Sequence, residues 1–424
     1  MKLFQIYHKI ILLFFIFMFM APSVFADDLS PSDDTFDISE ILGDIESIET
    51  NSDTSELPTI NSRAYVVIDR KSNTILIEKN ENQKKKMAST TKIMTALVVI
   101  EHCDLSDTVE VSKKAASTGG SRLGLKTGDK LTVCDLLYGL MMRSGNDAAV
   151  CLAEHVAGSI TDFANLMNEK AKSLGLSNTH FVTPHGLDED EHYTTAYELA
   201  ILSNYAMNNE IFAKIVGTKN YTITINGYPK TLTNTNELLG VLNGVYGIKT
   251  GFTNGANRCL VTCCKRGAMD IICVVLGADT KKYRTTDSIK LIEYAFQNFT
   301  YVNIEEIISN HFEIWKKENL PTITVSKGVS NYLDITFEEI PYSSIPVRSD
   351  LVNNFQVYIN YESNLNAPIS KGTSIGTITL ELEEQTIYSG NILVNTDIEH
   401  KNILDYLYDF CQNFSNIFNS ILEI

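Results

Sequence analysis

The chain has 424 residues, of which 44% are hydrophobic and 21% charged, and its formal net charge is −17. This length is roughly that of two to three domains, which excludes an isolated disulfide-stapled miniprotein. The acidity belongs to the two ends, because residues 61–300 carry 27 basic and 24 acidic side chains. No basic stripe is large enough for a nucleic-acid surface, so we expect no nucleic-acid partner.

Residues 1–26 have the pattern of a secretory signal peptide. Lys2 and Lys9 accompany a run of eleven apolar residues from Ile10 to Met20, and Val24-Phe25-Ala26 supplies the small residues of a cleavage site. Eleven residues are too few to span a bilayer, which needs about 20. We expect an exported protein, with an uncleaved N-terminal anchor as the alternative.

Residues 27–60 form an acidic leader. They contain eleven carboxylates, no lysine or arginine, and many serines and threonines. A segment of this composition buries too little apolar surface to offset the entropy lost on ordering. We therefore predict a disordered leader, in which a short helix around Ile38 to Ile48 would be poorly supported.

Residues 61–300 carry strand patterns on both sides of a helical block. The predicted strands are 63–69, 74–78, 244–250, 257–264 and 270–277, and the predicted helices are 89–102, 132–142, 147–157, 161–174, 195–207 and 284–299. The sheet must therefore be assembled from both ends of the segment. This order predicts an α/β sandwich with an inserted helical lobe and a cleft where lobe and sheet meet.

Residues 301–398 change to short alternating stretches separated by Gly, Pro, Asn and Ser, which predicts a small all-β domain. The expected strands include 322–325, 332–335, 356–359 and 374–382.

The last segment, 399–424, contains an amphipathic helix pattern at 401–423. Its apolar face consists of Leu404, Leu407, Phe410, Phe414, Ile417 and Ile421. The polar face carries acidic residues such as Asp405 and Asp409 and a single cation, Lys401, whereas surface-binding helices usually carry several. We expect peripheral attachment to a membrane surface, with packing against the β domain as the alternative.

Eight cysteines in an exported chain would suggest disulfides, but their positions favour structural thiols. Cys259, Cys263, Cys264 and Cys273 lie in apolar strand-like runs, where cysteine behaves as a small buried hydrophobe. No paired CxxC spacing occurs, and one or two bridges remain open.

The segment Ser89-Thr90-Thr91-Lys92 opens the first predicted helix. Because a spacing of three residues puts two side chains on one helical face, Lys92 can reach the hydroxyl of Ser89. A serine hydroxyl is a weak nucleophile until a base takes its proton, and a desolvated lysine is one of the few side chains able to do so. Taken alone, the same pattern also describes a helix cap followed by a surface lysine.

Two further motifs follow along the chain. Ser144-Gly145-Asn146 lies in a turn between helices, where Ser144 could relay a proton and Asn146 could hold Lys92. Lys249-Thr250-Gly251 follows a strand, and its cation, hydroxyl and glycine suit a substrate with a terminal carboxylate. Each recurs once elsewhere, as Ser389-Gly390-Asn391 and Lys126-Thr127-Gly128, so the motifs are specific only in their order and context.

The three motifs together agree with the S-x-x-K, S-x-N and K-T-G set of the serine penicillin-recognising enzymes. Residues 61–300 resemble the catalytic domain of D-alanyl-D-alanine carboxypeptidases, the low-molecular-mass penicillin-binding proteins. The resemblance rests on Met87 to Thr95, Met142 to Ala149, Thr179 to Phe181, His192 to Ala196 and Gly247 to Thr253. It implies an antiparallel sheet with an inserted helical lobe, and residues 305–396 and the terminal helix resemble the family's second domain and its membrane-associating tail.

The resemblance also implies the reaction. Ser89 would attack the carbonyl between two D-alanines of a peptidoglycan stem peptide, releasing the last one and forming an acyl-enzyme that water hydrolyses. Lys92 would be the general base, with Ser144 and Asn146 in the proton-transfer network. β-Lactam antibiotics would acylate the same serine as covalent inhibitors, and no cofactor or metal is implied.

The remaining site residues would bind the leaving group and the oxyanion. Lys249 and Thr250 would bind the carboxylate of the leaving D-alanine. The backbone N–H groups of Ser89 and Phe252 would form the oxyanion hole, with Gly251 between the two motifs. The enzyme would act outside the cytoplasm, peripherally on the outer face of the cytoplasmic membrane or in the cell wall.

Three alternatives share parts of this pattern. A serine β-lactamase of class A needs a Glu-x-x-Leu-Asn loop, which the helical stretch Glu198 to Leu202 does not match. A D,D-endopeptidase acting on cross-links would use the same motifs, although the added β domain favours a carboxypeptidase. A catalytically weak penicillin-binding envelope protein would keep the fold, but the intact Ser89 and Lys92 argue against it.

A metal hydrolase is the alternative from another mechanism. His180, His185, Asp188 and His192 are ligand types within thirteen residues, and zinc could use three of them. The segment is loop-like and lacks a helical HExxH, so we predict no metal site.

Overall fold

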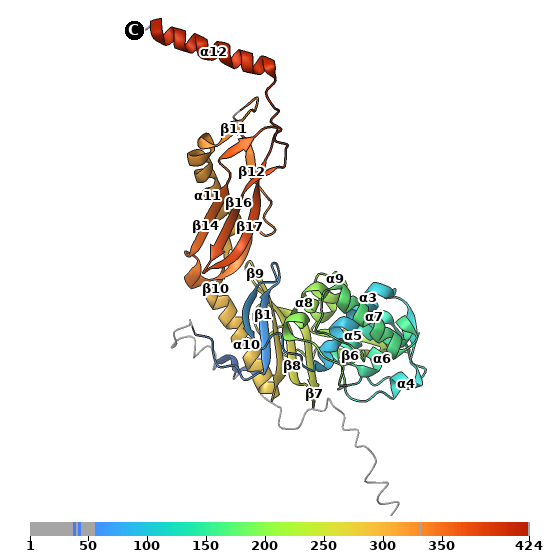
Figure 1. Cartoon of the computed structure of the whole chain (residues 1–424). Coiled ribbons are helices and arrows are strands. Elements are labelled where there is room, and N and C mark those ends of the chain that lie inside the picture. Colours follow the sequence, from blue (N-terminus) through green and yellow to red (C-terminus); the bar gives the residue numbers. More distant parts are fainter. Residues whose placement is uncertain (1–36, 40, 44–55, 331, 423–424) are drawn as a thin grey trace, which may run out of the picture. The chain divides into compact units, whose positions relative to one another are not determined.

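The computed structural model describes residues 37–39, 41–43, 56–330 and 332–422 (Figure 1). The chain divides into two compact units between Gln297 and Asn298. The predicted signal peptide (1–26) and most of the predicted leader (27–60) lie outside the described residues.

The first unit is built on a five-stranded antiparallel sheet with the order β2-β1-β9-β8-β7. Its strands are β1 (Ala64–Asp69), β2 (Ile75–Lys79), β7 (Val245–Thr253), β8 (Asn257–Arg266) and β9 (Met269–Ala278). The two N-terminal strands thus join three strands from the far end of the segment, which confirms the predicted assembly of the sheet. The central strands are buried along almost their whole length, as expected for a sheet covered on both faces.

The helices form a lobe inserted between β2 and β7. They are α3 (Lys92–His102), α4 (Lys113–Ala116), α5 (Val133–Met142), α6 (Asn146–Ala157), α7 (Ile160–Ser173), α8 (Ala196–Met207) and α9 (Glu210–Val216). Figure 1 shows most of them gathered beside the sheet, with α10 (Lys281–Asn298) on the opposite side. All α3 residues from Lys92 to Val99 are buried, so this helix forms the centre of the lobe.

Two short sheets in the lobe were not predicted. They are β3 (Thr108–Glu110) with β4 (Lys130–Thr132), and β5 (Asn220–Ile225) with β6 (Tyr228–Thr233). The turn between β5 and β6 is Asn226-Gly227, and both residues have positive φ. Asn-Gly is the strongest short hairpin signal, so the sequence did contain the information for this element.

All eight cysteines are free thiols. Cys259, Cys263, Cys264 and Cys273 are buried in β8 and β9, in line with the prediction of structural thiols. Burial raises the pKa of Cys264 to about 12 and also raises that of Cys263. These thiols therefore stay protonated and act as small apolar side chains.

The second unit contains a four-stranded antiparallel sheet in the order β12-β17-β16-β14 and a helix that precedes it. Its elements are β10 (Phe299–Asn303), α11 (Ile304–Asn319), β11 (Thr324–Ser326), β12 (Ile335–Phe337), β13 (Ser344–Arg348), β14 (Phe355–Tyr361), β15 (Asn364–Asn366), β16 (Ser374–Leu382) and β17 (Gln385–Val394). Residue Phe312 of α11 packs edge-on against Phe337 in the core of this unit. Helix α11 was not predicted from the sequence. The strand predicted at 332–335 begins three residues before β12, and Tyr332 is 75% exposed.

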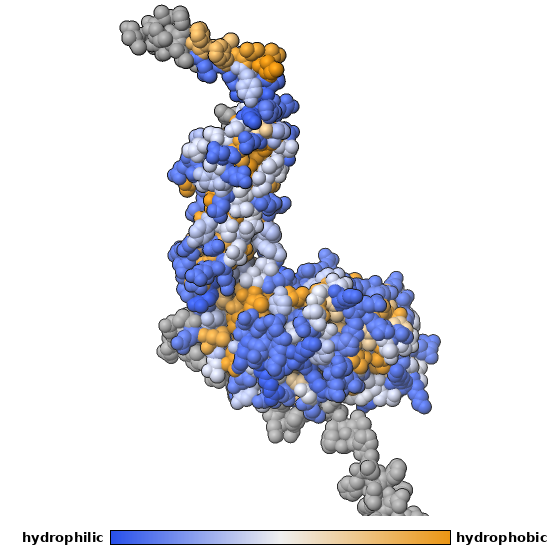
Figure 2. All heavy atoms as spheres, viewed as in Figure 1, coloured by the Kyte–Doolittle hydropathy of each residue, from blue (hydrophilic) through white to orange (hydrophobic). Residues whose placement is uncertain are grey.

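The predicted terminal helix is α12 (Ile403–Leu422). Its described apolar side chains are exposed, with Ile403 at 78%, Leu404 at 74% and Phe410 at 68%, and Figure 2 shows them gathered along the helix. The side chains beyond Ser415 lie outside the described residues. Within the described part of the chain, no helix is both long and apolar enough to cross a membrane.

Candidate active site

Ser89 lies in a short 3-10 turn, η1 (Ala88–Thr91), that leads directly into α3. Ala88 has φ of +48°, a left-handed conformation that costs a non-glycine residue free energy. Gly186 closes over this turn, where a Cβ atom would overlap the carbonyl oxygen of Ala88. The loop around Gly186 therefore presses on the turn, and this packing holds the Ser89 backbone in place.

Lys92 is the first residue of α3, three residues after Ser89, and its side chain is completely buried. Its Nζ is 2.7 Å from Ser89 Oγ, 2.7 Å from Asn146 Oδ1 and 2.8 Å from the carbonyl oxygen of His185. The orientation of the Asn146 amide is fixed, because its Nδ2 donates to the carbonyl oxygen of Gly119 at 2.9 Å. The two predicted motifs Ser89/Lys92 and Asn146 thus meet, although 54 residues separate Lys92 from Asn146.

Ser144 faces the same cavity from the turn before α6. Its φ is +57°, a left-handed conformation that is uncommon for serine and frequent at functional sites. Its Oγ is buried and has no hydrogen-bond partner among the described residues. A buried hydroxyl without a partner costs stability, so this group is arranged for something other than packing.

Strand β7 brings the third motif against the turn that carries Ser89, η1 (Ala88–Thr91). A Cβ atom on Gly251 would lie 3.1 Å from the backbone nitrogen of Ser89 and 3.2 Å from the Cβ of Ala88. Only glycine therefore permits this approach without displacing the turn. The hydroxyls of Thr250 and Thr235 lie 2.9 Å apart beside it.

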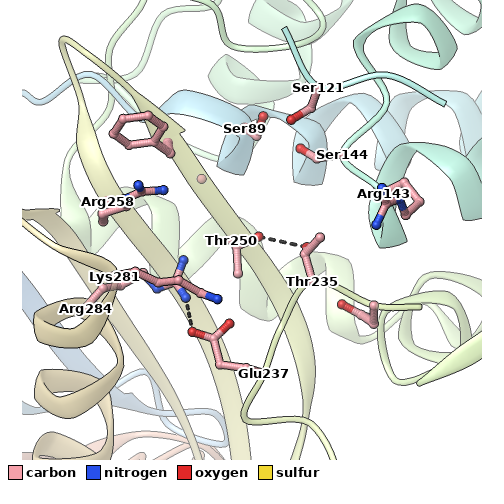
Figure 3. A pocket seen from close by; sticks show the side chains of 13 residues that line it. Ser89, Ser121, Arg143, Ser144, Thr235, Glu237, Thr250, Arg258, Lys281 and Arg284 are labelled. Carbon is pink, nitrogen blue, oxygen red and sulfur yellow. Dashed lines mark hydrogen bonds and ion pairs between the residues drawn. The ribbon is translucent and has the colours of Figure 1, made fainter. Parts of the chain in front are cut away.

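The residues surround a cavity of about 370 Å³ (Figure 3). The cavity is lined by Ser89, Ser121, Arg143, Ser144, Asn234, Thr235, Glu237, Thr250, Gly251, Phe252, Arg258, Lys281 and Arg284. Of the predicted site residues, Lys92 and Asn146 lie behind this lining. Lys249 is also outside it: the side chain is fully buried, and its Nζ donates to the carbonyl oxygen of Thr250 at 3.0 Å.

The loop that carries Ser121 also lines the cavity and was not predicted from the sequence. The carboxylate of Asp147 accepts backbone hydrogen bonds from Leu123, Gly124 and Leu125 at 2.8 to 3.0 Å. The backbone N–H of Asn146 also donates to the carbonyl oxygen of Ser121 at 2.7 Å. Asp147 directly follows the Ser144-Gly145-Asn146 motif. This adjacency was the only signal in the sequence that Asp147 holds the loop.

The cavity also has a charged wall, of which Glu237, Lys281 and Arg284 were not predicted from the sequence. Figure 3 shows Arg258, Lys281 and Arg284 on one side of Thr250, with Glu237 below. Glu237 forms an ion pair with Arg284 and accepts a hydrogen bond from Thr285 at 2.6 Å. Burial favours a raised pKa for Glu237, but Arg284 and the hydrogen bond outweigh it, and the net pKa is lowered. These residues come from separate segments, because Arg258 lies on β8, Lys281 and Arg284 lie on α10, and Glu237 lies between β6 and β7.

The four candidate metal ligands serve other contacts. His192 Nδ1 accepts from the backbone N–H of Val182 at 2.9 Å, and its Nε2 lies 2.8 Å from Thr91 Oγ1. Asp188 accepts from Thr253 Oγ1 and from the backbone N–H of Gly255, both at 2.7 Å, which ties the end of β7 down. Within the described ranges, no three His, Cys, Asp or Glu side chains converge as a metal-binding group.

Comparison with known proteins places this fold and site in a family. Residues 51–280 match the family model described as D-alanyl-D-alanine carboxypeptidase, and residues 311–400 match that of the penicillin-binding protein 5 C-terminal domain. The D-alanyl-D-alanine carboxypeptidase DacF of Bacillus subtilis is 35% identical over 360 residues, 84% of this chain and 90% of that protein. DacC of Escherichia coli is 35% identical over 369 residues, covering 84% and 89%.

Solved structures agree with these relatives. Penicillin-binding protein 5 from Haemophilus influenzae superposes with a TM-score of 0.65 at 30% identity, over 81% of this chain and 99% of that one. The DD-transpeptidase of Streptomyces K15 gives 0.55 at 35% identity, over 57% and 99%. The chain therefore belongs to the D-alanyl-D-alanine carboxypeptidase family, a family of serine-type hydrolases. This confirms the fold class and the activity that the sequence motifs predicted.

Proposed function

We propose that this chain removes the terminal D-alanine from peptidoglycan stem peptides through an acyl-enzyme on Ser89. The observation that carries the proposal is the 2.7 Å contact between Ser89 Oγ and Lys92 Nζ at the edge of the cavity. Ser89 Oγ attacks the carbonyl carbon between the two D-alanines, the peptide C–N bond breaks, and the leaving amine takes up a proton. Water then hydrolyses the ester and regenerates Ser89.

The contacts of Lys92 explain how it acts as the base. An ammonium group has three protons, and three acceptors surround Nζ. A neutral amine has two protons and one lone pair, so one of the three neighbours must donate a hydrogen bond to Nζ instead of accepting one. The carbonyl oxygens of Asn146 and His185 cannot donate, and only the Ser89 hydroxyl can. When neutral, Lys92 therefore accepts a hydrogen bond from the Ser89 hydroxyl, which is the arrangement that general-base catalysis requires.

Ser144 and the oxyanion donors complete the mechanism. The unpartnered Oγ of Ser144 is available to pass a proton between Lys92 and the leaving amine. Gly251 packs against the backbone nitrogen of Ser89, and Phe252 is the next residue in the strand, which supports the joint use of the Ser89 and Phe252 N–H groups as the oxyanion hole. Each donor of this kind is worth roughly 3–4 kcal/mol of transition-state stabilisation.

Penicillin labelling tests the nucleophile, and D-alanine release tests the reaction. We expect Ser89→Ala to abolish covalent labelling by a fluorescent penicillin and D-alanine release from a pentapeptide. The exposed Ser117→Ala is the matched control and should label normally. Persistent labelling of Ser89→Ala would remove Ser89 as the nucleophile. Labelling without D-alanine release in the unmodified chain would instead indicate a catalytically weak binding protein.

We also propose the location of the enzyme. Residues 1–26 would direct export, and residues 401–423 would bind peripherally to the outer face of the cytoplasmic membrane. The exposed apolar side chains of α12 support this, since Ile403 and Leu404 are more than 70% exposed. A chain ending at residue 400 should move from the membrane to the soluble fraction while its D-alanine release is retained. Unchanged fractionation would exclude the helix as the anchor.

A further inference from the structure

The direction of the Ser89 N–H is set by the peptide unit that joins Ala88 to Ser89. This N–H and the carbonyl of Ala88 belong to the same planar unit, so the two groups point in opposite directions and turn together. Ala88 has φ of +48°, which a non-glycine residue keeps only where its surroundings hold it. Any group that fixes the Ala88 carbonyl oxygen therefore also aims the Ser89 N–H.

The side chain of Thr91 holds the Ala88 carbonyl oxygen. Thr91 Oγ1 lies 2.7 Å from that oxygen, and because a carbonyl can only accept, the threonine hydroxyl donates. The hydroxyl has one proton, so its oxygen can only accept from any further group. His192 Nε2 lies 2.8 Å from it. Both side chains are buried, with exposed fractions of 0% for Thr91 and 2% for His192, so water competes little for these bonds.

The other ring nitrogen of His192 determines the direction of this contact. Nδ1 lies 2.9 Å from the backbone nitrogen of Val182, whose N–H can only donate, so Nδ1 carries no proton. Burial lowers the pKa of His192 to about 3, so the ring is neutral near pH 7 and carries its one proton on Nε2. Nε2 therefore donates to Thr91 Oγ1. The hydrogen bonds form one directed chain, from Val182 through His192 and Thr91 to the Ala88 carbonyl oxygen.

The loop that carries His192 packs directly on this chain of hydrogen bonds. Gly186 of the same loop has φ of +86°, and a Cβ atom there would overlap both the Ala88 carbonyl oxygen and Thr91 Oγ1. The ring of Phe181 meets the ring of His192 edge-on, with 5.7 Å between the centroids and 78° between the planes. This packing holds the His192 ring in the orientation that its two hydrogen bonds require.

We infer that Thr91 and His192 are positioning residues that aim the Ser89 N–H at the oxyanion. This role rests on the proposed function, in which that N–H is one of the two oxyanion donors. Neither Thr91 nor His192 lines the cavity, so both act through the peptide unit and not by contact with the substrate. Hydrogen bonds in a chain also polarise one another, so the bond to the Ala88 carbonyl strengthens the Ser89 N–H as a donor.

Penicillin acylation separates this role from a purely structural one. It can be resolved into the dissociation constant of the first complex and the rate constant of acylation. We expect Thr91→Val to lower the acylation rate constant about 10-fold, because the oxyanion forms only on the way through the transition state. The dissociation constant should stay within about 2-fold. Thr91→Ser keeps the hydroxyl and should acylate within about 3-fold of the unmodified chain.

Thr95→Val is the matched control. The hydroxyl of Thr95 is equally buried, lies one turn further along α3, and donates to the carbonyl oxygen of Pro184 at 2.7 Å. The control therefore removes a buried hydroxyl between the same helix and the same loop, but not one that touches the peptide unit of Ser89. Thr95→Val should lose as much thermal stability as Thr91→Val and should keep its acylation rate constant.

The outcomes are distinct. An acylation rate constant of Thr91→Val within about 2-fold of the unmodified chain would overturn the positioning role, as would an equal loss in Thr95→Val. An unmodified chain that penicillin does not acylate would refute the proposed function and this role with it. If Thr91→Val does not fold, as judged by thermal unfolding, His192→Phe applies the same test, because it keeps a ring beside Phe181 and removes the donor to Thr91. A similar loss of rate constant is then expected, and an unchanged one would overturn the role.

Discussion

The contact between Gly251 and the turn that carries Ser89, η1, gives the sharpest prediction from the geometry. In Gly251→Ala, the new methyl group would lie 3.1 Å from Ser89 N and 3.2 Å from both the Ala88 Cβ and the Met87 carbonyl oxygen. These distances are shorter than ordinary van der Waals contact by a few tenths of an ångström. The neighbours are backbone atoms and a Cβ, so the turn or the strand must move.

The movement would act on catalysis more than on stability. Overpacking of this size costs about 1–3 kcal/mol of folding free energy. The same shift separates the Ser89 and Phe252 N–H groups, and losing one oxyanion donor costs roughly 100- to 1,000-fold in rate. A partial displacement should therefore reduce penicillin acylation and D-alanine release by about 10- to 100-fold.

Gly217→Ala provides the control for this prediction. Its Cβ atom would lie 3.1 Å from the carbonyl oxygens of Ala213 and Tyr246, which is equally tight but outside the cavity lining. Both variants should lose similar thermal stability, and only Gly251→Ala should lose acylation rate. If Gly251→Ala acylates within about 2-fold of the unmodified enzyme, the close approach does not position the oxyanion hole.

Three further predictions follow from other groups of the site. Asp147→Ala removes the acceptor of several buried backbone donors. The free energy of unfolding by urea should therefore fall by about 3–5 kcal/mol. A fall below about 1 kcal/mol would show that the backbone donors of the loop find other partners. Ser144→Ala removes a buried hydroxyl that has no partner among the described residues. Thermal stability should stay equal or rise by up to about 1 kcal/mol, while D-alanine release falls at least about 10-fold. Release at the original rate would exclude the relay. Burial lowers the pKa of both His185 and His192 to about 3, from 6.5. The unfolded chain therefore binds more protons below pH 6.5, and stability is full above that pH and decreases as pH falls, by up to about 1.4 kcal/mol per pH unit for each histidine. Urea unfolding between pH 7 and 5 should show a shallower pH dependence for His192→Gln than for the parent or for the exposed His311→Gln, and equal slopes would contradict this account.

The sequence alone predicted most of the first unit, because its elements are long and strongly periodic. The strands at both ends and the buried helix after Ser89 followed from hydrophobic spacing, and the motif order identified the family. Helix α11 and strand β12 were missed for different reasons. Helix α11 does carry helical spacing, because Ile304, Ile308 and Phe312 lie buried along one side of it, so the sequence held a signal that was not used. Strand β12 contains only three residues, which is too few for a periodic signal.

For the site, the sequence by itself determined which residue types are present and the chemistry they suit. A three-residue spacing on one helix is a local fact, so the pairing of Ser89 with Lys92 could be predicted and the structure has it at 2.7 Å. What only the tertiary structure decided is how distant segments divide the work. Lys249 and Arg258 lie on the neighbouring antiparallel strands β7 and β8, and of the two only Arg258 lines the cavity. Side-chain direction depends on register, and register is fixed by packing between strands rather than by any residue alone.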